Sequence, residues 1–273
     1  MFLRSQGRVE TMPIPTSQRV IYQNNPLDEV ICQVRFPPVL RIGMQPPVEF
    51  QEDVRCSYPL YEEKTADLDA AGVPPEIAKI ISQGWPTSAS RVHLFTSSDE
   101  KWIATLRHDA LSLTAKHYER WEEFRDRFQD LVNTLIRHYG SPFYSRVGLR
   151  YKDVIRRAKL HLKDVPWADL LQPHIAGELA CEEVRGEIDR AARQVGLRLA
   201  TASGQVLVRH GLATDSEIKE ECFLIDSDYF STERTETNDV IRRLNEFNRQ
   251  AGNLFRWCIT KRLHEAMGPR PVE

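Results

Sequence analysis

Residues 91–140 read RVHLFTSSDEKWIATLRHDALSLTAKHYERWEEFRDRFQDLVNTLIRHYG, and this stretch decides the fold. From Trp121 to Tyr139, apolar residues recur at steps of three and four, as on an amphipathic helix. Before that, apolar and polar residues alternate in three short runs, as in strands that bury one face. These runs are separated by short polar turns and lie at 91–95, 101–107 and 111–117. The stretch therefore predicts an antiparallel meander followed by a long helix.

Similar elements are expected before and after this stretch. An alternating run starts at Leu27 and ends before Pro37, and a short helix is expected from Pro47, because proline suits a first helical turn. Pro74 and Pro75 are expected to open another helical turn. After the long helix ends, the expected elements are a strand at 144–156, a short helix at 167–171, a helix within 179–194, strands at 197–200, 205–212 and 222–230, and one helix at 237–267.

The two series of elements share one order: strand, short helices, meander, long helix. Such an order predicts an α+β fold in which long helices cover antiparallel sheets. We therefore expect pseudo-duplicated halves packed as one compact unit, although no letter-by-letter repeat relates them. The expected boundaries are a flexible tail at 1–18, halves at 19–141 and 142–268, and a second tail at 269–273.

Composition limits the classes of function. The chain has 273 residues, of which 41% are hydrophobic, enough to bury a sizeable core. Its formal net charge of -2 gives no overall field that favours nucleic acid. Five cysteines without a CxxC pair argue against a disulfide framework or a zinc site, and no apolar run suits a signal peptide or a membrane span. We expect a soluble cytoplasmic protein with no membrane contact and no cofactor.

Several short motifs together resemble a known family. They are Gly148-Leu149-Arg150-Tyr151 at the centre, Asn25-Pro26-Leu27-Asp28-Glu29-Val30 with Arg35-Phe36-Pro37, Phe223-Leu224-Ile225-Asp226-Ser227-Asp228, and Leu254-Phe255 with Ile259-Thr260. The chain is similar in these motifs to a sporadically distributed bacterial and archaeal family with no assigned activity. In that family the central motif usually continues with an apolar residue and Asn, where this chain has Lys152 and Asp153. The resemblance implies a shared fold, and the family's patchy distribution implies a link to mobile elements or phage defence.

A row of basic residues is the first candidate binding site. Period-two spacing places Arg146, Arg150, Lys152 and Arg156 on one side of the strand expected at 144–156. Such a row suits a phosphate backbone, which would make the protein a nucleic-acid binder. The alternative is that these charges pair with carboxylates on neighbouring strands, leaving an ordinary solvated face.

Two carboxylates form the second candidate site. Asp226 and Asp228 are two residues apart on an expected strand, so they share a face and could bind a divalent cation. A catalytic metal site would need a third acidic ligand, for which the sequence offers Asp153, Glu182 and Glu183. The alternative is that the pair turns the chain or binds the basic row, for example through Asp228 and Arg150.

No familiar catalytic motif accompanies these residues. The eight histidines form no HxxxH or HxH pair, and the chain has no GxSxG, Walker loop, GxGxxG or HExxH. We therefore expect a non-catalytic protein-binding or adaptor protein, or one that self-associates. The alternatives are a nucleic-acid binder that uses the basic row and a metal-dependent phosphoryl-transfer or hydrolytic enzyme at Asp226 and Asp228.

Overall fold

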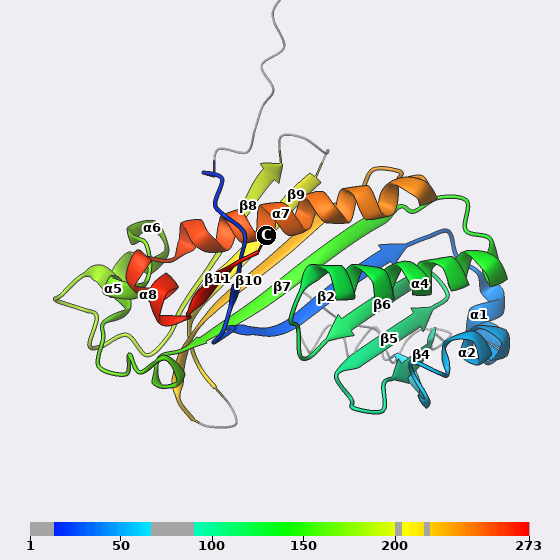
Figure 1. Cartoon of the computed structure of the whole chain (residues 1–273), viewed down its shortest axis with the longest axis horizontal. Coiled ribbons are helices and arrows are strands. Elements are labelled where there is room, and N and C mark those ends of the chain that lie inside the picture. Colours follow the sequence, from blue (N-terminus) through cyan, green and yellow to red (C-terminus); the bar gives the residue numbers. More distant parts are fainter. Residues whose placement is uncertain (1–13, 67–89, 200–203, 216–218, 273) are drawn as a thin grey trace, which may run out of the picture.

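The computed structural model describes residues 14–66, 90–199, 204–215 and 219–272. One antiparallel sheet of nine strands runs through it in the order β3-β4-β5-β6-β2-β7-β10-β9-β8 (Figure 1). These strands are β2 (Leu27–Arg35), β3 (Leu60–Ala66), β4 (Ser90–Thr96), β5 (Trp102–Arg107), β6 (Ala110–Ala115), β7 (Arg146–Arg156), β8 (Ala191–Leu199), β9 (Gly204–Thr214) and β10 (Glu221–Ser231).

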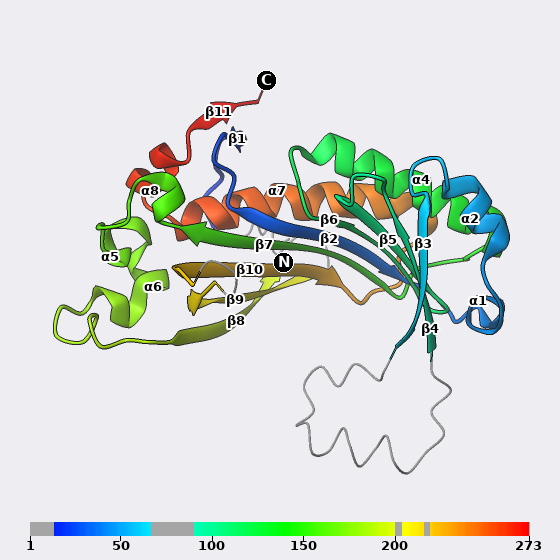
Figure 2. The same cartoon turned by 90° about the horizontal axis from the view of Figure 1, so that it is seen from below.

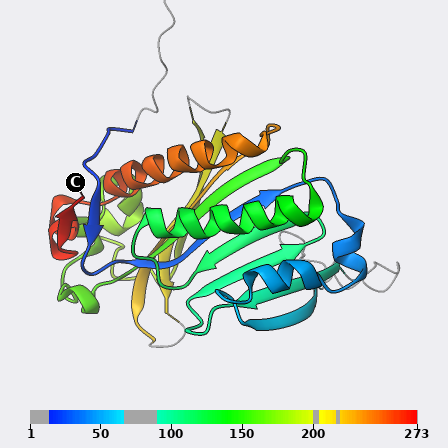
Figure 3. The same ribbon diagram turned by 45° about the vertical axis from the view of Figure 1, so that its right-hand side comes forward.

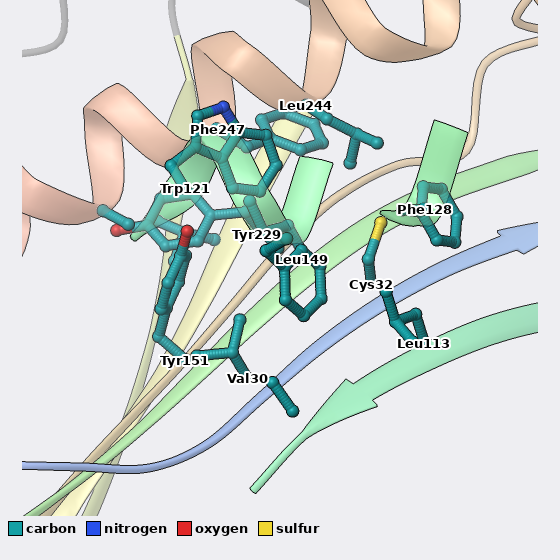
Figure 4. Packing of buried hydrophobic residues seen from close by; sticks show 14 of the residues in the cluster. Val30, Cys32, Leu113, Trp121, Phe128, Leu149, Tyr151, Tyr229, Leu244 and Phe247 are labelled. Carbon is teal, nitrogen blue, oxygen red and sulfur yellow. The ribbon is translucent and has the colours of Figure 1, made fainter. Parts of the chain in front are cut away.

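Two long helices cover one face of this sheet. Helices α4 (Trp121–Tyr139) and α7 (Val240–Cys258) lie on the same side of the strands (Figure 2). Their apolar stripes pack onto the inward-facing side chains of the central strands, where Phe128 and Phe247 are fully buried with Leu149 (Figure 4). The expected α+β fold, an antiparallel sheet covered by long helices, is therefore confirmed.

The pairing of strands joins the two halves into one sheet. In the first half, β2 pairs with β6, the last strand of its meander, and in the second half β7 pairs with β10, the last strand of the second meander. The neighbouring strands β2 and β7 then pair with each other. The order of elements therefore agrees with the expectation, whereas the duplication itself stays a prediction.

The first meander and its helix form where the sequence places them. Strands β4, β5 and β6 pair in succession, and α4 begins at Trp121 and ends at Tyr139. Gly140 ends the helix with φ of 60°, a left-handed conformation that glycine adopts without strain. Pro47 likewise precedes α2 (Val48–Val54), as predicted. The helical turn expected from Pro74 lies outside the described residues.

The helix predicted within 179–194 is wrong. A 3₁₀ turn, η2 (Gly177–Ala180), is followed by irregular chain and then by β8. Strand β8 pairs with β9 along its whole length, from Ala191 opposite Leu212 to Leu199 opposite Gly204. Pairing to a long neighbouring strand outweighed a weak helical pattern that Gly186 already interrupted.

The single helix predicted at 237–267 is also wrong. A 3₁₀ turn, η3 (Thr237–Asp239), leads into α7, which ends at Cys258, and a separate helix α8 spans Lys261–Ala266. Between them Ile259 is extended, with φ of -111° and ψ of 153°, and bridges to Leu171. Thr260 caps α8, because its hydroxyl accepts a hydrogen bond from the Leu263 amide.

The remaining elements lie around the ends of the sheet. They are α1 (Leu40–Met44), η1 (Ala158–Leu160), α5 (Trp167–Leu170), α6 (Pro173–Ala176), and a two-stranded sheet of β1 (Val20–Tyr22) and β11 (Pro269–Pro271). Helix α5 was predicted from its apolar residues, whereas α1 and β3 were not predicted. No helix of the described part of the chain is long and apolar enough to cross a membrane.

Part of each expected tail belongs to the packed structure. Residues 1–13 of the first tail lie outside the described residues, but Ile14, next in the chain, is 7% exposed and belongs to the core. In the second tail, Pro269–Pro271 pairs with Val20–Tyr22. The chain ends therefore contribute to the packed structure at these residues.

Candidate functional site

The basic row lies on the face of the sheet opposite the two long helices. Arg150 forms a two-pronged pair with Asp226, with Nε 2.7 Å from Oδ1 and Nη2 2.8 Å from Oδ2. Arg146 lies with Nη2 3.1 Å from Oδ2 of Asp228. Asp228 is thus paired, although with Arg146 and not with Arg150. Burial raises the pKa of Asp228, and both arginines offset part of this rise.

The other two members of the row are paired as well. Lys152 lies 3.0 Å from Asp28, and Arg156 lies 3.3 Å from Asp28 and 2.6 Å from Asp215. Every cation of the predicted row therefore has a carboxylate within ion-pair distance. The geometry corresponds to the alternative in which these charges pair with neighbouring strands.

The acidic pair is committed to the same network. Asp226 is 3% exposed and accepts from Arg150 and, at 3.4 Å, from Arg209. Among the residues that the structure describes, no group of three or more His, Cys, Asp or Glu could hold a metal ion. The third ligands considered do not join the pair, since Glu182 and Glu183 lie in the exposed turn after η2 and Asp153 faces the helices.

A chamber lies on the other face, between the sheet and α7. It has a volume of about 450 Å³. Its floor comes from β7 and β10, through Tyr151, Asp153 and Ser227, and one wall comes from α7, through Asn248 and other residues of 248–256. Residues 16–22 and the loop before α4 form further sides. Segments distant in sequence therefore build one partly open site, of a size common for small-molecule sites.

Asp153 is the chemical centre of this chamber. Its side chain is 5% exposed, and no residue of the described chain donates a hydrogen bond to its carboxyl group. Burial raises its pKa to about 8, and the neighbouring charge of Asp226 adds to the rise. A buried carboxyl without a partner is costly when ionised, so at neutral pH this group is mostly protonated.

From the sequence, Asp153 is a candidate only as a third metal ligand. A signal was nevertheless present in the alternation of β7. Val147, Leu149, Tyr151 and Ile155 occupy the apolar face, and Asp153 is the one charged residue at the same parity. A carboxyl in the middle of an apolar face is the pattern that could have drawn attention to this position.

Aromatic side chains make up much of the chamber lining. Tyr118 and Tyr151 have ring centroids 5.9 Å apart and perpendicular planes, and Tyr22 meets Phe255 edge to face at 5.9 Å. The Tyr151 hydroxyl donates to Oδ1 of Asn248 on α7 at 2.8 Å. Tyr151 and Trp121 lie between the sheet and the long helices (Figure 4). The chamber thus combines rings with the carboxyl group of Asp153 and with Arg256, whose buried Nη1 has no hydrogen-bond partner among the described residues.

The segment of residues 14–22, which we call the strap, forms one side of the chamber. Figure 3 shows its course in dark blue. The Ser17 amide donates to Oδ1 of Asn253 at 2.9 Å, and Arg19 forms a two-pronged pair with Glu122 at 2.7 and 2.9 Å. At its end, the Tyr22 hydroxyl lies 2.8 Å from Nδ1 of His264. These contacts fix the strap to both α4 and the C-terminal part of the chain.

Comparison with known proteins adds no assignment. No family model matches the chain, and no curated protein matches it in sequence. The fold and the chamber are therefore the observations from which function can be inferred.

Proposed function

We propose that this chain is a non-catalytic binding protein that holds a small organic molecule in the chamber beneath α7. The observation that carries the proposal is Asp153, a buried carboxyl group that lines a cavity of about 450 Å³ and has no partner among the described residues. A buried carboxyl group without a hydrogen-bond partner lowers the stability of the fold, and a ligand that supplies the partner offsets this loss.

The lining supports binding more than catalysis. Ser227 lies on the floor, but no histidine or cysteine is present among the described lining residues to activate it. Asn248, Asn253 and Ser227 offer neutral hydrogen-bonding groups that orient a ligand without reacting with it. Their mixture with aromatic rings is common in binding pockets.

The functions expected from the sequence remain proposals of lower rank. A protein-binding or adaptor role, with a partner or a second copy, is compatible with a ligand in the chamber. Nucleic-acid binding through Arg146, Arg150, Lys152 and Arg156 has less support, because a phosphate backbone would have to displace their carboxylates. A metal-dependent enzyme at Asp226 and Asp228 has less support for the same reason.

The duplication and the family membership are also proposals. Support for the duplication comes from the pairing of each half's first strand with the last strand of its own meander. Support for the family comes from the motifs alone. Two of these motifs contribute to the sites, since Tyr151 and Ser227 line the chamber while Arg150 and Asp226 pair on the other face.

A thermal-shift screen against a library of small metabolites tests the proposed function. We expect ligands that raise the melting temperature of the wild type and lose this effect in Ser227→Leu, which adds bulk to the chamber floor. Ser112→Leu is the matched control, because Ser112 lies on β6 away from the chamber lining. Gly252→Leu is a second filling variant, at a chamber position where an added Cβ meets no atom within 4 Å. Ligands that stabilise all four proteins equally would contradict the proposal.

A further inference from the structure

We propose that the ligand of the chamber carries an organic cation, an amine or ammonium group that contacts the carboxyl group of Asp153. This inference rests on the proposed function and names the ligand's chemical class. It follows from the charges around the floor, from the aromatic lining and from the volume of the site.

The charges on the two faces of the sheet differ in one respect. On the open face the carboxylates of Asp28, Asp226 and Asp228 each have an arginine or lysine partner. On the chamber face Asp153 has none among the described residues, although it is more than nine-tenths buried. A cationic group of a ligand would complete the same kind of pair that its neighbours already form.

The arginines of the chamber do not supply this pair. Arg19 is committed to Glu122 through two hydrogen bonds. Arg120 donates to the same Glu122, and Arg249 is exposed on α7, where solvent screens its charge. Arg256, on the α7 wall, has a buried Nη1 without a hydrogen-bond partner among the described residues, and its charge acts on Tyr22 and His264. The pKa of Asp153 is set by burial and by Asp226, with no contribution from an arginine. The carboxyl group of Asp153 is therefore the charged group of the floor, where a cationic group of a ligand would bind, and Arg256 is a second charged group on the α7 wall.

The rings provide a second reason for a cation. The faces of Tyr and Trp attract ammonium groups through their quadrupoles, and boxes of such rings bind alkylated ammonium ligands. Tyr22, Tyr118, Tyr151 and Trp121 all line the chamber. Burial raises the pKa of Tyr22 to about 12, so its ring remains neutral and electron-rich at physiological pH. At the floor, the rings and the carboxyl group together match a cationic group of a ligand better than a neutral or anionic one.

The volume of the chamber restricts the size of the ligand, and the protonated carboxyl group predicts a proton linkage. A cavity of about 450 Å³ holds a compact molecule. Because Asp153 is mostly protonated in the empty chamber, a bound cation must displace its proton to solvent. Affinity should therefore rise about tenfold per pH unit below the pKa and level off above it.

Titration calorimetry with three aromatic probes tests this inference. Phenethylamine is the cation, phenethyl alcohol is its neutral counterpart, and phenylpropionate is the anion. We expect phenethylamine alone to bind well, about tenfold tighter at pH 7 than at pH 6, with release of about one proton per ligand. Asp153→Asn should weaken its binding at least about 30-fold and remove the pH dependence.

The outcomes separate this inference from the proposed function. If phenethyl alcohol binds as tightly as phenethylamine, and Ser227→Leu abolishes the binding of both, the inference of a cationic ligand is overturned. The chamber would still be a binding site. Phenethylamine binding that is unchanged in Asp153→Asn would also overturn the inference of a cationic ligand. If no probe binds and the library screen yields only neutral or anionic ligands of the chamber, the inference of a cationic ligand is overturned, while the proposed function stands. A screen without any chamber ligand would overturn both.

Discussion

Replacing Asp153 by Asn should make the protein more stable at neutral pH. In the unfolded chain this carboxyl ionises near its ordinary pKa of 3.8, whereas in the folded chain burial raises its pKa to about 8. Each pKa unit of difference corresponds to about 1.4 kcal/mol. Between pH 4 and pH 7 the wild type therefore loses about 4 kcal/mol of stability that the uncharged Asn variant retains.

The sign follows from proton counts. Between the two pKa values the folded protein holds one proton at Asp153 that the unfolded chain has released. The free energy of unfolding therefore falls as pH rises through this range, and it stops falling once the folded carboxyl also ionises, above about pH 8. Below pH 4 both states are protonated, so wild type and variant should differ little there.

Urea denaturation at several pH values between about 4 and 9 measures this difference. Asp189→Asn is the matched control, because Asp189 is exposed and its replacement should change stability by less than about 0.5 kcal/mol. The reasoning is refuted if Asp153→Asn and the wild type keep the same difference in unfolding free energy at every pH. It is also refuted if the variant is the less stable protein at pH 8.

Three further substitutions test other parts of the structure by the same denaturation assay. Asp226→Ala should cost about 2 kcal/mol, because it leaves Arg150 without its two-pronged partner, and a loss below about 0.5 kcal/mol would show that the pair is solvated. Gly211→Ala should cost about 3 kcal/mol, since its new Cβ would lie 1.9 Å from the Ala191 carbonyl oxygen, and wild-type stability would contradict the pairing of β8 with β9. Gly252→Ala should instead raise stability by up to about 1 kcal/mol, because Gly252 is in an open helical position of α7, and a clear loss would contradict that placement.

The sequence predicted the elements whose position is set by the spacing of their own apolar residues. The stripe from Trp121 to Tyr139 and the alternation from Leu27 gave a helix and a strand at nearly the observed residues. Strand β8 was missed over most of its length because it lies at the sheet edge and is largely exposed, so burial imposes no clear alternation on it. The end of α7 was missed because the extended Ile259 depends on a bridge to Leu171, far away in sequence.

In the candidate sites, too, features set by local sequence were predictable and features set by distant contacts were not. The alternation of β7 predicted which residues share the basic row, and pairing with neighbouring strands was one of the alternatives. The choice of partner was not predictable, because Arg150 lies opposite Asp228 in register yet binds Asp226 diagonally. The chamber could not be predicted from local patterns, since one of its sides is the strap. The Ser17 amide of the strap donates to Asn253, which is 236 residues away in sequence.

Titration of the Asp153 carboxyl carbon by nuclear magnetic resonance tests the central claim most directly. In protein with labelled aspartate side chains, the Asp153 signal is identified by its absence from Asp153→Asn. We predict a midpoint near pH 8 in the empty chamber and a midpoint below about pH 7 when phenethylamine is bound. A midpoint near pH 4 in the empty protein would contradict the claim that this carboxyl is buried without a partner.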